Sequence, residues 1–139
     1  MDYKKQNRQS SASKEMLDRI EYFFETDFPK GLKEILKQNN DVTYYTSQKE
    51  IQFLSTKEIK EYYDCYLFAQ YMPEAIPFAM DGFGNFIMLK KHEGTKIYGA
   101  NSGNLGWEDS VIFGNSFEDF LEDSTPPYEV ITSLALMPF

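Results

Sequence analysis

The apolar residues near the N-terminus recur with a helical period in two consecutive segments. Over residues 14–25 they fall on one face, which predicts an amphipathic helix. Ser13 is placed to cap this helix, because a serine hydroxyl can accept a hydrogen bond from an unpaired main-chain N–H. A second helix is predicted to begin at Pro29, where a missing N–H costs nothing, and to stop at Asn39-Asn40.

A third helical segment follows Ser55, which forms a capping box with Glu58 three residues later. Apolar and aromatic positions continue with helical spacing to about Gln70, and Pro73 follows shortly afterwards. We therefore expect one continuous helix between Ser55 and Gln70. A last short helix is predicted over residues 116–123, with Ser116 as its cap.

Between these helices the chain shows the alternation and the turn residues that are typical of short strands. Strands are predicted over residues 42–46, 49–54, 76–80, 85–90, 96–100 and 110–113. In the turn at residues 81–85 we assign a structural role to Asp81, Gly82 and Gly84, because glycine adopts positive φ without steric cost. The order of elements predicts an α+β fold with a mostly antiparallel sheet of five to six strands and helices packed on it.

The two ends of the chain have different patterns. Residues 1–13 are polar and without a period, so a flexible tail is predicted there and a single domain over residues 14–139. Within that domain, residues 128–139 are apolar and are expected to pack back as a strand or an extended arm.

The length of 139 residues and the hydrophobic content of 42% fit one domain with its own core. Cys65 is the only cysteine, so an internal disulfide is excluded and a reducing, cytoplasmic location is expected. No apolar run is long enough to span a membrane, and the first 14 residues lack the apolar segment of a signal peptide.

The net charge of −8 is concentrated at the C-terminal end. Residues 108–139 contain seven acidic residues and no lysine or arginine. No basic cluster exists to bind a nucleic acid, whereas an acidic surface attracts a basic protein partner and speeds its encounter. The alternative, an ordinary acidic surface that only maintains solubility, is left open by the charge alone.

The residue types that catalysis and metal binding require are scarce. His92 is the only histidine and sits in a polar turn, and Cys65 lies in the tyrosine-rich helix, where we expect a core or half-buried structural thiol. A structural zinc site needs four Cys or His ligands, so it is excluded within one chain. No cofactor and no catalytic residue is predicted.

The aromatic residues are the remaining candidates for function. The chain has 10 tyrosines and one tryptophan, residue types that are favoured at protein interfaces, although most of them are equally compatible with the core. Trp107-Glu108-Asp109 follows a glycine-containing loop and is the site expected to be most exposed. We predict a partner-binding site at Trp107, Glu108 and Asp109, with Glu118 and Glu122 increasing the association rate.

Three stretches together resemble one known family. They are Phe28-Pro29-Lys30-Gly31-Leu32-Lys33-Glu34-Ile35-Leu36, Ile76-Pro77-Phe78-Ala79-Met80-Asp81-Gly82-Phe83-Gly84-Asn85-Phe86, and Val111-Ile112-Phe113-Gly114-Asn115-Ser116-Phe117-Glu118-Asp119-Phe120-Leu121. Their order and spacing over residues 14–123 resemble the SUKH superfamily. It includes bacterial immunity proteins, fungal cell-wall glucan-synthesis regulators of the Smi/Knr type and the SecY-interacting protein Syd. Asn39-Asn40-Asp41 departs from the Asn-Gly-Gly frequent there, which leaves the subfamily open.

The resemblance implies a SUKH-like fold and a non-enzymatic protein-binding function. Its bacterial members are similar in role to antitoxins that neutralise a cognate toxin, often a nuclease, inside the producing cell. We therefore expect an immunity protein whose partner is a basic toxin domain. A regulatory or scaffold module that resembles the glucan-synthesis regulators is the alternative, and a small hydrolase is a further one that lacks an evident base. Self-association is also left open.

Overall fold

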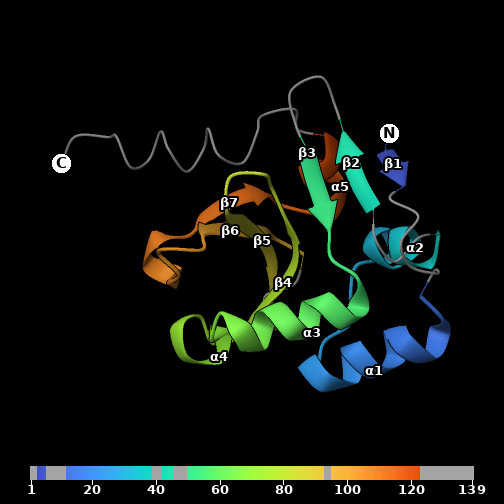
Figure 1. Cartoon of the computed structure of the whole chain (residues 1–139), viewed down its shortest axis with the longest axis horizontal. Helices are drawn as coiled ribbons and strands as arrows, with labels where there is room; N and C mark the ends of the chain where they lie inside the picture. Colours follow the sequence, from blue (N-terminus) through green and yellow to red (C-terminus); the bar gives the residue numbers. More distant parts are fainter. Residues whose placement is uncertain (1–2, 6–11, 39–41, 46–49, 93–94, 123–139) are drawn as a thin grey trace.

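The computed structural model describes residues 3–5, 12–38, 42–45, 50–92 and 95–122 (Figure 1). The helices in this part of the chain are α1 (Lys14–Phe24), α2 (Lys30–Gln38), α3 (Thr56–Cys65), α4 (Phe68–Tyr71) and α5 (Phe117–Glu122). The strands are β1 (Tyr3–Lys5), β2 (Val42–Tyr45), β3 (Glu50–Phe53), β4 (Ala75–Met80), β5 (Asn85–Lys90), β6 (Ile97–Asn101) and β7 (Val111–Gly114). A 3-10 turn, η1 (Trp107–Asp109), lies between β6 and β7. The predicted arm at residues 128–139 lies outside the described residues.

The strands form one sheet in which the spatial order, β1 to β7, is also the order along the chain. Every neighbouring pair is antiparallel, which confirms the predicted α+β fold with an antiparallel sheet. Within the described residues the sheet has seven strands, whereas about five to six were predicted. The additional strand, β1, lies in the segment predicted to be a tail without secondary structure. That segment lacks an alternating pattern, and β1 is formed by main-chain pairing with β2, in the register Tyr3↔Tyr44.

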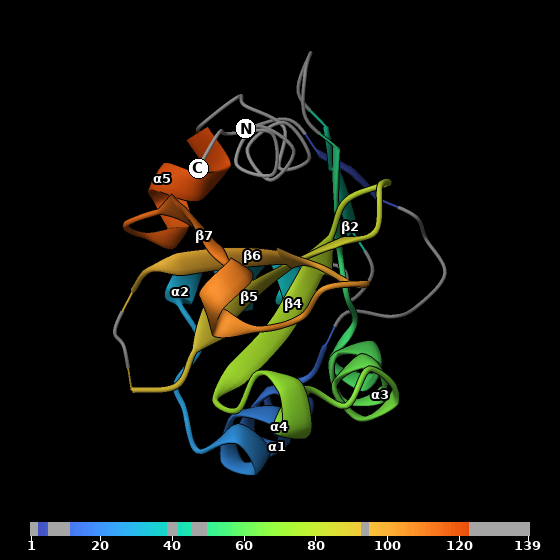
Figure 2. The same ribbon diagram turned by 90° about the vertical axis from the view of Figure 1, so that its left-hand side faces the viewer.

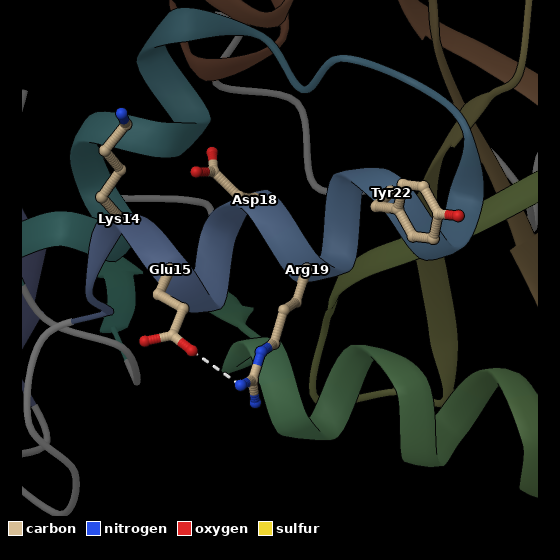
Figure 3. Close-up of a pocket in the computed structure, with 5 residues that line it drawn as sticks. All are labelled: Lys14, Glu15, Asp18, Arg19 and Tyr22. Atoms are coloured by element: carbon tan, nitrogen blue, oxygen red, sulfur yellow. Dashed lines mark hydrogen bonds and ion pairs between the residues drawn. The ribbon is translucent and has the colours of Figure 1, made fainter.

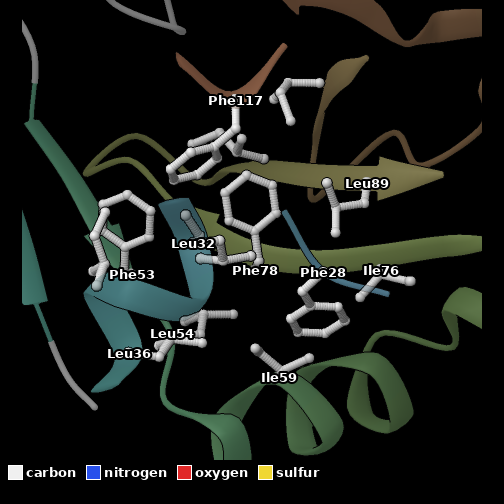
Figure 4. Close-up of a cluster of buried hydrophobic side chains, with 14 of the residues drawn as sticks. Phe28, Leu32, Leu36, Phe53, Leu54, Ile59, Ile76, Phe78, Leu89 and Phe117 are labelled. Atoms are coloured by element: carbon white, nitrogen blue, oxygen red, sulfur yellow. The ribbon is translucent and has the colours of Figure 1, made fainter. Parts of the chain in front are cut away.

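Residues on the central strands alternate between two apolar clusters on opposite faces of the sheet. On β5, Ile87 and Leu89 belong to the larger cluster, whereas Phe86 and Met88 belong to the smaller one. Helices α1, α2, α3 and α5 contribute to the larger cluster, part of which is shown in Figure 4. The smaller cluster is completed from α4 and its exit by Phe68 and Met72. The fold thus places α4 and α5 over different faces of the same sheet.

The helix caps predicted from the sequence are confirmed. The Ser13 hydroxyl accepts the main-chain N–H of Met16 at 3.1 Å. Ser55 and Glu58 form both hydrogen bonds of a capping box, at 3.1 and 3.0 Å. Ser116 caps α5 by accepting the N–H of Asp119 at 3.0 Å.

The continuous helix predicted between residues 55 and 70 is wrong, because α3 ends at Cys65 and α4 begins at Phe68. Leu67 between them has a left-handed backbone, with φ of 57°. Its N–H bonds the carbonyl of Asp64 and so closes the last turn of α3. The break turns the chain so that Phe68 is buried in the smaller cluster.

A buried carboxylate organises the turn between β4 and β5. One oxygen of Asp81, Oδ1, accepts the main-chain N–H groups of Phe83 and Asn85, at 2.8 and 3.0 Å. Its other oxygen accepts the side-chain amide of Asn85 at 2.8 Å. Gly84 has a positive φ of 82°, which glycine adopts without strain. Gly82 does not have a positive φ, and a Cβ added to it would meet open space. The contacts account for Asp81, and the positive φ accounts for Gly84. No feature of the described structure requires glycine at Gly82, so the role predicted for it in this turn is not supported.

Candidate functional site

Three of the residues predicted to bind a partner lie together on η1, the turn that leads into β7. Glu108 and Asp109 are exposed, as the sequence led us to expect. Trp107 is only half-buried, because its indole packs edge-on against Tyr98 with 5.2 Å between ring centroids. The tryptophan therefore holds η1 in place, and the two carboxylates project beside it.

The indole N–H of Trp107 ties η1 to a distant part of the chain. It donates a 2.8 Å hydrogen bond to the main-chain carbonyl of Pro73, which lies two residues after the end of α4. The ammonium of Lys90 lies 4.5 Å from the centroid of the same ring, a cation–π distance. Consequently η1 and α4 lie at the same end of the molecule, as Figures 1 and 2 show.

Large apolar side chains are exposed at the junction between α3 and α4 and on α4 itself. Leu67 and Tyr71 are 50% and 51% exposed, and Tyr66 is 37% exposed. Tyr66 stacks on Tyr62 at 5.9 Å and meets Phe86 of the smaller cluster edge-on at 4.9 Å. We call this end of the molecule the α4–η1 surface and define it by Tyr66, Leu67, Tyr71, Glu74, Trp107, Glu108 and Asp109.

The α4–η1 surface contains three carboxylates, and the ammonium of Lys90 lies over the ring of Trp107 at the same surface. Glu74, Glu108 and Asp109 are exposed, and none of them has an ion-pair partner among the residues that the structure describes. Exposed aromatic and apolar groups beside free carboxylates can receive a partner that presents lysine or arginine around an apolar residue.

The other two predicted residues, Glu118 and Glu122, are not brought to this surface. They are exposed on α5, which follows the C-terminal end of β7, whereas η1 precedes its N-terminal end. Figure 1 shows η1 and α5 on opposite sides of the sheet's last strand. The five residues grouped by sequence therefore occupy two separate places.

Three further tyrosines that pack against the smaller apolar cluster are half-buried, so they belong to the packing beneath the α4–η1 surface. Tyr62, Tyr63 and Tyr98 pack against this cluster, and the side chains of Tyr44 and Tyr45 are outside the described residues. Burial, and then the nearby charge of Glu58, raise the pKa of the Tyr62 phenol above its ordinary value.

Two residues considered for catalysis lie apart on the surface. Cys65 is exposed at the end of α3, so the prediction of a core or half-buried thiol is wrong. The apolar face of α3 that meets the sheet contains Ile59, and the helix breaks directly after Cys65. His92 is exposed in the turn after β5, as predicted. Within the described ranges, no group of three or more His, Cys, Asp or Glu residues could hold a metal ion.

A hollow of about 520 Å³ runs along α1 but has no features of a binding site. Its lining residues are Lys14, Glu15, Asp18, Arg19 and Tyr22 (Figure 3). All five are exposed and come from one helix face, and Glu15 pairs with Arg19 at 2.6 Å. Such an open, solvated helix face offers no enclosed volume to a small molecule.

Sequence reasoning missed Leu67 and Glu74, two residues of the α4–η1 surface. Both have positive φ, at 57° and 76°. Neither is a residue type that favours this conformation, so no pattern in the chain indicated it. The nearest sequence feature was Pro73, which indicated that the helical segment ends there but gave no indication of the positive φ at Leu67 or Glu74.

Comparison with known proteins agrees with the fold. Residues 11–123 match the model of the SMI1/KNR4 family, also called SUKH-1. Because the match covers most of the chain, this protein belongs to the SMI1/KNR4 family. No curated protein matches the chain. Of the helices that the structure describes, none is long and apolar enough to cross a membrane.

Proposed function

We propose that this protein is a bacterial immunity protein, a non-enzymatic domain that binds and neutralises a cognate toxin in the cytoplasm. The toxin domain is basic, and a nuclease is the class that fits best, because enzymes that bind nucleic acid present basic surfaces. The observation that carries the proposal is the α4–η1 surface, where exposed carboxylates and exposed aromatic and apolar side chains lie at one end of the molecule.

Membership of the SMI1/KNR4 family and the chain's overall charge support this function. The net charge of −8 would accelerate the encounter with a basic protein, and Glu118 and Glu122 on α5 contribute to that long-range attraction. Neutralisation needs only that the bound protein blocks the toxin's substrate site. The proposal therefore requires no catalytic residue and no cofactor.

The alternative is a regulatory or scaffold module that resembles the cell-wall glucan-synthesis regulators from which the family takes its name. Such a module would use the same surface for a different protein. A small hydrolase is the weakest candidate, because His92 and Cys65 are both exposed and belong to different elements. Replacement of both residues together is expected to leave neutralisation unchanged.

Co-expression with the toxin domain encoded beside the gene of this protein tests the proposal. We expect the protein to restore growth, and the purified pair to bind with an affinity that falls as salt is added. Neither rescue nor binding would contradict the immunity function. Selective recovery of cell-envelope synthesis or signalling proteins on the immobilised chain would instead favour the regulatory module.

A further inference from the structure

Two residues with unfavourable backbone conformations flank α4. Among the described residues, only four other than glycine have positive φ: Glu25, Leu67, Glu74 and His92. Leu67 immediately precedes α4, and Glu74 follows it by three residues. Side chains with a Cβ are strained in this region, and glycine is the residue that adopts it freely. Strained residues that persist in a fold are often maintained by function.

Leu67 lies where helices commonly end in glycine. It follows the C-cap of α3, and its N–H bonds the carbonyl of Asp64, as in a left-handed helix ending. Its side chain is 50% exposed and belongs to neither apolar cluster. A glycine would form the same ending with less strain, so the leucine side chain is not needed for this turn.

Glu74 is a second residue with a backbone conformation that glycine would adopt with less strain, and its side chain is charged. Its φ is 76°, and its main-chain carbonyl accepts the N–H of Lys91 at 2.8 Å. The main chain of Glu74 therefore contributes a hydrogen bond to the fold, whatever its side chain does. Its exposed carboxylate has no ion-pair partner in the part of the chain that the structure describes.

We propose that Leu67 and Glu74 are contact residues for a basic protein partner, Leu67 as the apolar anchor and Glu74 as an ion-pairing group. The inference rests on the proposed function and assigns its contact to the α4 segment. Tyr71 is exposed between the two residues, and Glu108 and Asp109 on η1 extend the negative charge. A partner with a lysine or arginine beside an apolar residue matches this arrangement.

Glycine and alanine variants at the same position separate strain from side-chain function. Both remove the side chain, but only glycine relieves the backbone. We expect Leu67→Gly to melt about 3–5 °C above Leu67→Ala, and the same order for the two variants of Glu74. Affinity is measured by calorimetry with the neighbouring toxin domain in catalytically inactive form. We expect both Leu67 variants to bind it at least about tenfold more weakly, and Leu67→Met to bind like the wild type.

Glu25 is the matched control, because it has φ of 55° at the end of α1 and lies outside the α4–η1 surface. Glu25→Gly should also melt above Glu25→Ala, with unchanged affinity for the toxin domain. The assignment is overturned if Leu67→Gly and Glu74→Gly bind as tightly as the wild type, or if Glu25→Gly weakens binding equally. Failure of the wild-type protein to bind the toxin domain would instead defeat the proposed function, and the assignment with it.

Discussion

The indole Nε1 of Trp107 donates a 2.8 Å hydrogen bond to the carbonyl oxygen of Pro73, across 34 positions of sequence. This contact joins the connection between β6 and β7 to the exit of α4. It thereby places η1, which contains Glu108 and Asp109, at the same end of the molecule as the exposed apolar residues of the α3–α4 junction. The α4–η1 surface exists because of this pairing, so several of its properties can be tested through Trp107.

Trp107→Phe is expected to lower the free energy of unfolding by at least about 1 kcal/mol, because the hydrogen bond to Pro73 is lost and the smaller phenyl ring keeps only part of the packing. Urea unfolding measures this change. Trp107→Ala should cost more, since the packing against Tyr98 is removed as well. Equal stability of Trp107→Phe and the wild type would mean that the hydrogen bond does not hold η1.

Charge reversal at Glu108 and Asp109 together is expected to weaken binding of a basic partner at least about tenfold, with much of the loss in the dissociation rate. Surface plasmon resonance with the inactive toxin domain measures both rates. The reversal replaces two attractive contacts with two repulsive ones directly on the α4–η1 surface.

The same change at Glu118 and Glu122 is the matched control, because both pairs are exposed and carry the same charge. On α5 the reversal should slow association at low salt and leave dissociation nearly unchanged. If the α5 variant lost as much affinity as the η1 variant, the contact surface would have been assigned to the wrong end of β7.

Gly99→Ala is expected to destabilise the protein by about 1–3 kcal/mol, because the added methyl group would overlap an aromatic ring. A Cβ on Gly99 would lie 2.0 Å from Cε2 of Phe113 on the neighbouring strand. Gly82→Ala is the control, since no atom lies within 4 Å of a Cβ there. Thermal unfolding should separate the two variants, and shortening Phe113 to leucine should partly rescue Gly99→Ala.

Stability should fall as the pH rises above about 10, in part through Tyr62. Burial, and then the charge of Glu58, raise the pKa of this phenol in the folded state. The folded state therefore holds the proton more tightly than the unfolded state, so this contribution is complete below the unfolded pKa and is lost as pH rises through the folded pKa. Tyr62→Phe should show a smaller loss of stability between about pH 9 and pH 11 in urea titrations. An unchanged slope would mean that Tyr62 does not contribute.

The elements that local chemistry controls could be predicted from the sequence. Ser13, Ser55 and Ser116 begin the helices at the expected places, because each capping bond spans only three residues. The break at Leu67 could not be predicted, because leucine has no local preference for a left-handed backbone. The misplacement of Cys65 was avoidable, because it lies six residues after the buried Ile59 and therefore off the apolar face of α3.

The candidate site was only partly predictable. Glu108 and Asp109 were expected at the surface, and they are exposed there. Glu118 and Glu122 belong to the same acidic C-terminal segment and were predicted only to increase the association rate. In the structure, Glu108 and Asp109 lie before strand β7, and Glu118 and Glu122 lie after it. Closeness in sequence does not show that residues at the two ends of a strand are separated in space.

The sequence by itself determined the α+β class and the mostly antiparallel sheet, because these depend on periodicity, caps and turns between neighbouring residues. The family was indicated by the resemblance of three stretches of the sequence to known members. Only the tertiary structure decided that β1 would join the sheet, that α4 would lie over the opposite face from α5, and that Trp107 would reach Pro73. These outcomes depend on contacts between residues far apart in the chain, whose free energy is set by packing and by hydrogen bonds that exist only in the folded protein.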